Sequence, residues 1–484
     1  MEAKKTAETR QLRDLQARRQ CQSARELESS GDYEGARAAL SGLWIRIGER
    51  PVIEKLQSDT QAEVLLRVGA LAGWLGSAQQ IGGAQEFAKD LLGESIRLFE
   101  SLSATQKKSE AQTDLAICYW REGALDEARV LLREALAAAT SPEGQLRVLV
   151  NSSVVEISDQ NPDQAMTLLS AAASLEELVP DSSLRGRYHQ QLGLTYKRLS
   201  GAENLDRALI EWSAASLYFK QAKHIRYQAR IENNLGFLLL QLDRHFEALL
   251  HLDKARNIFV ALKDTGSVAQ VNETRARVFI AQERYSEAES AAFAAVSTLE
   301  QGGEQPLLAE ALLTQGIALA RRGRHQGACS IFRRSANIAS TAGDPQSAAV
   351  AYLTMIEELQ QLVASSELLK FYREADDLLG TSPSKNNLTR LRLCGRIVTE
   401  SLGKSDSVES SSIGGSFEQE ILQFEAQLIK RALDQANGSI TRAARSLGIT
   451  HQGLAFIIDN RHNKALGRAR NPKRIRRRSL TTKQ

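Results

Sequence analysis

Residues 236–255 read GFLLLQLDRHFEALLHLDKA, and the spacing of three small residues in this stretch decides the fold. Gly236 precedes Ala248 by twelve residues, and Ala255 follows Ala248 by seven. The same pattern returns 40 residues later in ARVFIAQERYSEAESAAFAA, residues 276–295. Small residues on two consecutive helices let the helices cross closely, because bulkier side chains would push them apart. The pattern therefore predicts hairpins of two helices that repeat along the chain.

Around eight such hairpins can be placed by one alanine on the second helix of each. These alanines are Ala36, Ala88, Ala128, Ala165, Ala208, Ala248, Ala288 and Ala328. The 52-residue step from Ala36 to Ala88 indicates an insertion, which we expect around residues 76–83. The step from Gly193 to Ala208 is 15 residues instead of 12, and a loop at 200–202 would absorb the difference. A degenerate last pair at 346–379 is expected to cap the array, followed by one more helix at 386–401.

Aromatic residues recur in phase with the small ones. Tyr119 and Tyr196 follow Ala116 and Gly193 by three positions. This pattern resembles the tetratricopeptide repeat, whose usual period is about 34 residues, so the longer period here implies longer helices or turns. The resemblance implies an all-α fold, a tetratricopeptide-type solenoid of helical hairpins over residues 1–401, whose concave surface holds a protein or peptide. A generic array of helical hairpins is the alternative.

Composition agrees with a helical protein. Aromatic residues make up 5% of the 484 residues and only 8 prolines occur, which favours helix over sheet. The four cysteines are scattered without any CxxC pair, as is typical of reduced cysteines in the cytosol. No apolar stretch is long enough to span a bilayer, so we expect no membrane partner.

Positive charge is concentrated at one end of the chain. From Phe417 onward there are 14 Lys and Arg residues against 5 Asp and Glu residues, a net charge of +9. The preceding 416 residues carry 48 basic and 53 acidic side chains, a net charge of −5. A polyanion is therefore expected to bind at the C-terminal end.

Residues 402–416 are rich in Ser and Gly and nearly devoid of apolar side chains. We expect a flexible linker there rather than an ordered surface loop. Ser416 and Gln419 have the spacing of a capping box for a helix that begins at Phe417. The apolar stripe of this helix is wide enough for two contacts, one with the following helices and one with a second copy of the chain. A three-helix monomer is the alternative, but 46 residues make a small core.

Residues 440–459, ITRAARSLGITHQGLAFIID, have the pattern of a helix-turn-helix. Ala444 leaves room for two helices to cross, and Gly448 permits the positive φ of the turn between them. The wedge between the helices is expected to contain Leu447, Ile449, Leu454 and Ile457. A helix beginning near Thr450 would then be free to enter a major groove.

Together with the preceding helix, this stretch resembles the Fis-type DNA-binding domain, which also ends the bacterial NtrC-class activators. The resemblance covers residues 417–462 and rests on Glu425, Leu428, Ile429, Ala432, Leu433, Asn437, Gly438, Ala443, Ala444, Leu447, Gly448 and Ile449. It implies a small domain of three to four helices that forms a dimer. Each subunit would read one half-site with its recognition helix.

The resemblance also assigns candidate residues that read base edges. By position these are Thr450, His451, Gln452, Gly453, Ala455 and Phe456. Thr450 would cap the recognition helix, Gln452 would grip an adenine edge, and His451 would contact a guanine or a phosphate. The family often has basic residues where this chain has Ala455 and Phe456, which would instead touch thymine methyl groups or leave a weaker reading surface.

Phosphate contacts are expected from residues beside the turn and from the basic tail, residues 463–484. The candidates are Ser439, Thr441, Arg442, Arg445, Arg461, Lys464, Arg468, Arg470, Lys473, Arg474, Arg476, Arg477 and Arg478. A solvated charge run is the ordinary explanation for such a tail, but a neighbouring helix-turn-helix favours contact with DNA.

Sequence motifs of catalysis are absent. The chain has no GxxxxGK[ST], HExxH or GxSxG motif and no dinucleotide fingerprint. Its isolated histidines, His462 among them, are expected to be surface or capping residues. We therefore expect that the protein is not an enzyme and that it binds no cofactor and no metal.

The expected function is that of a transcription regulator or DNA-anchored adaptor. Its partners would be double-stranded DNA, an unidentified protein or peptide on the concave face, and a second copy of the chain. It is expected to be a cytoplasmic bacterial protein, associated with the nucleoid when bound to DNA. The alternatives are a scaffold whose C-terminal domain only dimerises, and an RNA-binding adaptor.

Overall fold

The computed structural model describes the whole chain except residues 1, 200, 303, 381–383, 406–416 and 463–484. The described residues form helices and turns, with no strand among them. They divide into two compact units. The first contains Met1–Leu359 and Asp377–Pro383, and the second contains Gln360–Asp376 and Ser384–Gln484.

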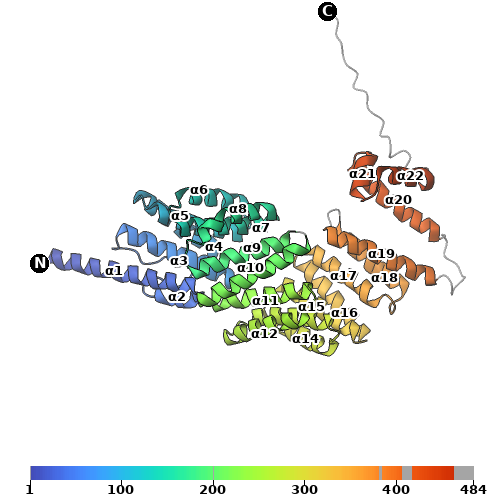
Figure 1. Cartoon of the computed structure of the whole chain (residues 1–484), viewed down its shortest axis with the longest axis horizontal. Helices are drawn as coiled ribbons and strands as arrows, with labels where there is room; N and C mark the ends of the chain where they lie inside the picture. The colour runs from blue at the N-terminus through green and yellow to red at the C-terminus, as the bar shows by residue number, and fades with distance from the viewer. Residues whose placement is uncertain (1, 200, 303, 381–383, 406–416, 463–484) are drawn as a thin grey trace, which may run out of the picture. The chain divides into compact units, whose positions relative to one another are not determined.

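Helices α1 to α17 belong to the first unit. They are α1 (Glu2–Ser29), α2 (Tyr33–Ala39), α3 (Ser58–Ala78), α4 (Ala84–Ser101), α5 (Thr105–Arg121), α6 (Leu125–Ala138), α7 (Pro142–Ser158), α8 (Pro162–Glu176), α9 (Ser182–Arg198), α10 (Ala202–Gln221), α11 (Ile225–Gln241), α12 (His245–Ala261), α13 (Thr265–Ala281), α14 (Tyr285–Gly302), α15 (Gln305–Arg321), α16 (His325–Thr341) and α17 (Pro345–Leu359). Figure 1 shows them stacked in consecutive pairs, as in a solenoid of helical hairpins. The expected all-α solenoid is thus confirmed.

The 40-residue period comes from long helices. Helices α11, α12 and α13 each have 17 residues and are joined by turns of three residues, so two helices and two turns fill one period. The middle residue of each turn has a left-handed backbone, with φ of 55° at Asp243 and at Lys263. In the first turn the amide of Arg244 donates to the carbonyl of Leu239 at 2.9 Å, which closes the C-terminus of α11.

The helices of each pair cross at the small residues. All eight alanines that mark the hairpins have no exposed surface. The partner positions are equally crowded, since a methyl group on Gly236 would lie 2.4 Å from Cγ of Leu252. A methyl group on Gly316 would lie 2.5 Å from Cε1 of Phe332. The expected close crossing is therefore confirmed at both positions.

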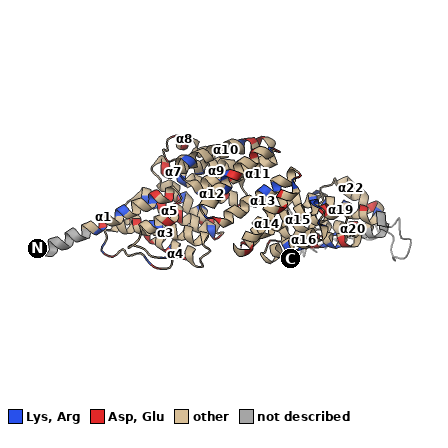
Figure 2. Cartoon of the chain, turned by 90° about the horizontal axis from the view of Figure 1, so that it is seen from below, with Lys and Arg blue, Asp and Glu red and all other residues tan. Residues whose placement is uncertain are grey.

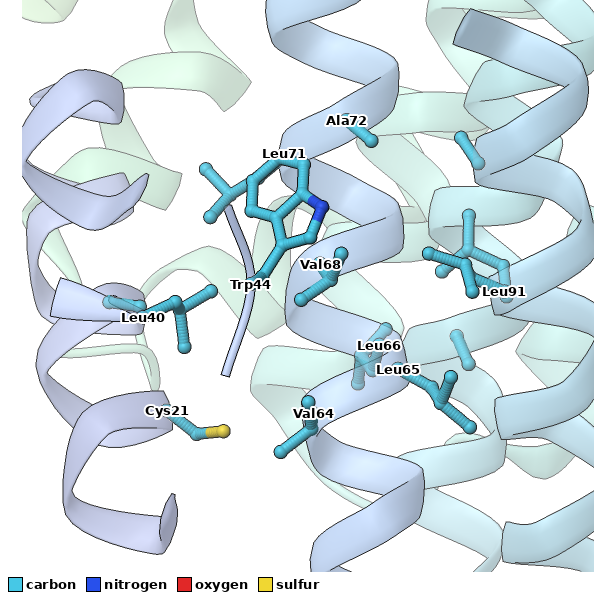
Figure 3. Packing of buried hydrophobic residues seen from close by; sticks show 14 of the residues in the cluster. Cys21, Leu40, Trp44, Val64, Leu65, Leu66, Val68, Leu71, Ala72 and Leu91 are labelled. Atoms are coloured by element: carbon cyan, nitrogen blue, oxygen red, sulfur yellow. The ribbon is translucent and has the colours of Figure 1, made fainter. Parts of the chain in front are cut away.

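The insertion near the N-terminus is not where the sequence predicts it. Residues 79–83 form only the short turn between α3 and α4, and the long connection is residues 40–57, between α2 and α3. This connection is anchored by apolar side chains, because Leu40 and Trp44 are buried against α3 (Figure 3). The spacing of the alanines gives the length of the insertion but not its position between Ala36 and Ala88.

The additional residues between Gly193 and Ala208 also have a different place. Helix α9 ends at Arg198 and α10 begins at Ala202, so the number of positions between the two helices is the usual three. Helix α10 is instead longer, with 20 residues in place of 17. The predicted longer loop is therefore wrong, and the difference is one additional turn of helix.

The second unit contains α18 (Ser365–Leu379) in large part, α19 (Lys385–Ser405), α20 (Phe417–Gln435), α21 (Ile440–Ser446) and α22 (His451–Arg461). This division groups α18 and α19 with the C-terminal helices, whereas the sequence pattern assigns residues 1–401 to the solenoid. Residues 402–405 of the expected linker belong to α19, which corrects that boundary. The remaining linker residues, 406–416, lie outside the described part of the chain.

Charged side chains of both signs are interleaved along the repeat helices (Figure 2). Many of them pair between helices, as Arg129 does with Glu156 at 2.8 Å. Such partly exposed pairs contribute little to stability, about 0–1 kcal/mol each. In the described part of the chain, no helix combines the length and apolar character that crossing a membrane requires.

We predict that Ala328→Leu destabilises the repeat region, because the larger side chain must enter a fully buried helix crossing on α16. Overpacking of this kind costs about 1–3 kcal/mol and should lower the melting temperature of the full chain. Ser330→Leu, at an exposed position of the same helix, is the matched control. Equal melting temperatures for the two variants in a thermal scan would contradict the close crossing at Ala328.

Candidate nucleic-acid interface

Helices α20, α21 and α22 share a small apolar core. Leu433 of α20, Ala443 of α21, and Leu454 and Ile458 of α22 have no exposed surface. Ile429 and Ala432 extend the buried face of α20. Three helices thus bury one side each and leave the opposite sides to solvent.

The turn between α21 and α22 has the geometry of a helix-turn-helix. Gly448 has a φ of 67°, which a residue with a side chain adopts only with strain. The amide of Ile449 donates to the carbonyl of Ala444 at 3.0 Å and so terminates α21. Ala444 is buried at the crossing, as its small size requires. The short turn and the small side chain together allow α22 to cross α21 closely.

Only Leu454 of the four expected wedge residues is fully buried. Ile449 is 40% exposed, and Leu447 and Ile457 are partly buried against the core. Ile458 is buried as well, because it lies four residues after Leu454 on the same face of α22. The wedge thus contains Ile458 in addition to Ile457, which still packs against the core.

The N-terminus of α22 is capped and open to solvent. The hydroxyl of Thr450 accepts a hydrogen bond from the amide of Gly453 at 3.0 Å, so the expected cap is present. Thr450, His451 and Gln452 are exposed, and Gly453 is half-buried. These four residues therefore form an accessible end of the helix.

The next turn of α22 carries the two residues that depart from the family pattern. Ala455 is half-buried, whereas Phe456 is 68% exposed. An exposed phenyl ring of this size on the outer side of α22 is available to an apolar partner. It continues the accessible surface that begins at Thr450.

The structure places five of the predicted phosphate contacts. Thr441, Arg442, Arg445 and Arg461 are exposed, while Ser439 is half-buried and occupies the N-cap of α21 without a side-chain bond to it. Arg442 and Arg445 form no ion pair with any described residue. Arg461 lies 3.5 Å from Glu425 and so is partly neutralised. The others, Lys464, Arg468, Arg470, Lys473, Arg474, Arg476, Arg477 and Arg478, lie outside the described residues.

One interaction of this domain has no signal in the sequence. His462 is 3% exposed, and its Nε2 lies 2.9 Å from Oε2 of Glu425. The pair joins the end of α22 to α20 across 37 residues of sequence. His462 is also the C-cap residue of α22, so the expected capping role is confirmed, whereas its burial and its pairing with Glu425 differ from an isolated surface residue.

Two family models match the chain. The model of the tetratricopeptide repeat matches residues 227–301, which contain α12 and α13. The model of the Fis family of bacterial regulatory proteins matches residues 421–455, from α20 into α22. None of the curated proteins compared with the chain matches it.

Several solved structures are similar in part. A signal-transduction ATPase with a tetratricopeptide-repeat sensor from Pyrococcus horikoshii has 13% identity and a TM-score of 0.49 over 78% of this chain. The match spans only 54% of that protein. A Rap protein solved with competence and sporulation factor has 13% identity and a TM-score of 0.49, over 75% of this chain and 99% of that chain. Aspartyl phosphate phosphatase F from Bacillus subtilis has 13% identity and a TM-score of 0.42, over 72% of this chain and 92% of that chain.

The match to the tetratricopeptide repeat agrees with the small residues at which helices α11 to α14 cross. The match to the Fis family agrees with the short turn between α21 and α22. A helix-turn-helix of this family implies DNA as a partner, and tetratricopeptide repeats imply protein partners. The chain therefore combines a tetratricopeptide-repeat region with a C-terminal helix-turn-helix domain of the Fis family.

Proposed function

We propose that this protein is a transcription regulator that inserts α22 into the major groove of DNA. The observation that carries the proposal is the free N-terminus of α22, where Thr450, His451 and Gln452 are exposed above a capped helix end. Gln452 has an amide that can bond an adenine edge in two places, and His451 can donate to a guanine or a phosphate. The Fis-family match over residues 421–455 supports the same use of this helix.

Charge beside α22 supports binding to a polyanion. Arg442 and Arg445 of α21 are exposed and have no carboxylate partner among the described residues. Guanidinium groups that are free of carboxylates can bond phosphate oxygens without first breaking an ion pair. The basic sequence after His462 adds charge of the same sign.

The position of Phe456 also agrees with insertion of α22 into the major groove. Its ring is mostly exposed on α22 and would contact thymine methyl groups when the helix enters the groove. Base selection would then rest on the polar side chains of His451 and Gln452 and on apolar contacts. We expect a preference for A·T pairs near the centre of each half-site.

The outer face of α20 supports a dimer. Ile421, Phe424 and Leu428 are 38%, 46% and 43% exposed and are spaced for one helix face. The Phe424 ring lies 6.3 Å from the ring of Tyr372, which covers it only in part. A second copy of α20 would remove this apolar surface from water and give DNA two recognition helices.

The repeat region would bind a protein or peptide along the inner helices of its hairpins. The protein would act by binding rather than by catalysis, and would work in the cytoplasm, on the nucleoid when bound to DNA. A scaffold that uses α20 only to dimerise is the second candidate, because the exposed face of α20 would suit it equally well. DNA binding by the full chain separates the two candidates.

We predict that the double variant Arg442→Gln, Arg445→Gln binds random duplex DNA more weakly and with a flatter salt dependence. Each lost phosphate contact should reduce the slope of log K against log salt by about 0.9. Fluorescence anisotropy of the full chain, titrated at several salt concentrations, measures both quantities. Arg13→Gln, Arg19→Gln removes the same charge from exposed positions of α1 and is the control.

Equal slopes for the two double variants would contradict the role of α21. Absence of binding to duplex DNA by the unaltered chain would favour the scaffold instead. Displacement of duplex DNA by a structured RNA at equal concentration would contradict DNA as the partner.

We predict that Leu428→Glu converts the protein from dimer to monomer, because a carboxylate would have to be buried in the apolar contact between two α20 helices. Light scattering on the full chain gives the mass directly. Gln427→Glu adds the same charge at the neighbouring exposed position and should leave the dimer intact. A monomeric unaltered chain, or a Leu428→Glu variant that stays dimeric, would contradict this contact.

A further inference from the structure

Helix α19 belongs to the same compact unit as α20, α21 and α22. Leu391, Cys394 and Val398 are buried on one side of α19. Because they are three and four positions apart, they share one face of the helix and leave the opposite face to solvent. The helix precedes the segment that matches the Fis family, residues 421–455. Its solvent face has no role in the function proposed above.

The solvent face of α19 is positively charged. Lys385, Arg392 and Arg396 are exposed, and their spacing of seven and four residues aligns them along the helix. None of the three forms an ion pair with a residue that the structure describes. The sequence of α19 contains five basic residues and one acidic residue, Glu400. The charge of this face is therefore not neutralised within the helix.

Arg392 connects this face to the helix-turn-helix. Its Nη2 donates to the carbonyl of Leu447 at 3.2 Å, and a methyl group on Gly448 would lie 3.5 Å from the same nitrogen. Gly448 lies in the turn between α21 and α22, two residues before the Thr450 cap. Because a guanidinium has five N–H donors and the carbonyl is uncharged, most of the donors and the whole charge stay available.

Tyr372 of α18 provides a second contact between the same parts of the unit. Its ring lies 6.3 Å from the ring of Phe424 on α20. It also packs against α19, because a methyl group on Gly395 would lie 3.3 Å from Cε2 of Tyr372. One contact therefore joins α19 directly to the turn after α21, and the other joins it to α20 through Tyr372.

The spacing of the three cations suits the backbone of a duplex. A helix rises about 1.5 Å per residue, so the eleven steps from Lys385 to Arg396 span about 17 Å. Successive phosphates of one strand are about 3.4 Å apart along the duplex axis, so this face can follow about five base pairs. Arg442 and Arg445 on α21 are also unpaired among the described residues. Unpaired cations on two helices that meet at one turn favour a polyanion.

We propose that α19 is part of the DNA-binding surface, and that Lys385, Arg392 and Arg396 bond phosphates that flank the half-site of α22. This inference rests on the proposed function and extends it, because it assigns to DNA a helix that precedes the Fis-type domain. Guanidinium groups match phosphate oxygens through paired N–H donors. Contacts to phosphates carry no sequence information, so α19 raises the affinity for every duplex and orients the domain on it.

Arg396→Gln tests the inference most directly, because Arg396 has no partner among the described residues and its loss should leave the fold intact. Fluorescence anisotropy of the full chain on random duplex DNA, at several salt concentrations, gives the slope of log K against log salt. The slope should fall by about 0.9 for each lost phosphate contact, and twice as far for Arg392→Gln, Arg396→Gln.

Two controls separate charge from structure. The double variant Arg392→Lys, Arg396→Lys keeps both charges and should keep the slope. Lys220→Gln, Lys223→Gln removes two exposed charges at the end of α10 and in the turn after it, and should not change the slope. Thermal scans of all variants verify that each chain is folded.

The possible outcomes distinguish this inference from the proposed function. If the unaltered chain binds duplex DNA and the glutamine variants of α19 have the slope of the α10 control, the inference is wrong and the proposed function stands. If the unaltered chain does not bind duplex DNA, both are wrong. An equal fall of the slope for the glutamine and lysine variants would mean that Arg392 only supports the turn, and would also overturn the phosphate contacts.

Discussion

The close crossing of paired helices at small residues is the constraint on which the rest of this structure depends. Alanine or glycine at the crossing allows each hairpin to bury its apolar faces, and a 40-residue period repeats this arrangement from α11 onward. The same constraint operates at Ala444, where α21 and α22 cross. It determines which helices line the inside of the repeat region and which end of α22 stays free.

The positions of the hairpins could be predicted from sequence because the crossing tolerates so few residue types. The connection at residues 40–57 could not, since an apolar loop held by Trp44 carries no periodic signal. The burial of Ile458 beside Ile457 could not be predicted either, since it depends on how α22 is rotated against the other two helices. The bond between His462 and Glu425 depends on a tertiary contact that no local pattern contains.

In the candidate site, too, some features follow from the local sequence and others depend on contacts between distant residues. The cap at Thr450 follows from a local rule, because the first amides of a helix have no carbonyl partner within it and a threonine hydroxyl can accept from one of them. The contact between the turn at Gly31 and His224 at the start of α11 does not follow from such a rule, because it joins residues that lie far apart in the sequence.

In the proposed function, a pair of α22 helices reads DNA sequence through Gln452. Selection of bound sites from a random duplex pool, carried out with the full chain and with Gln452→Ala, tests it most directly. We expect a two-fold symmetric consensus with half-sites about one helical turn apart, and loss of one adenine preference per half-site in the variant. A pool without any consensus, or the same consensus for both proteins, would contradict it.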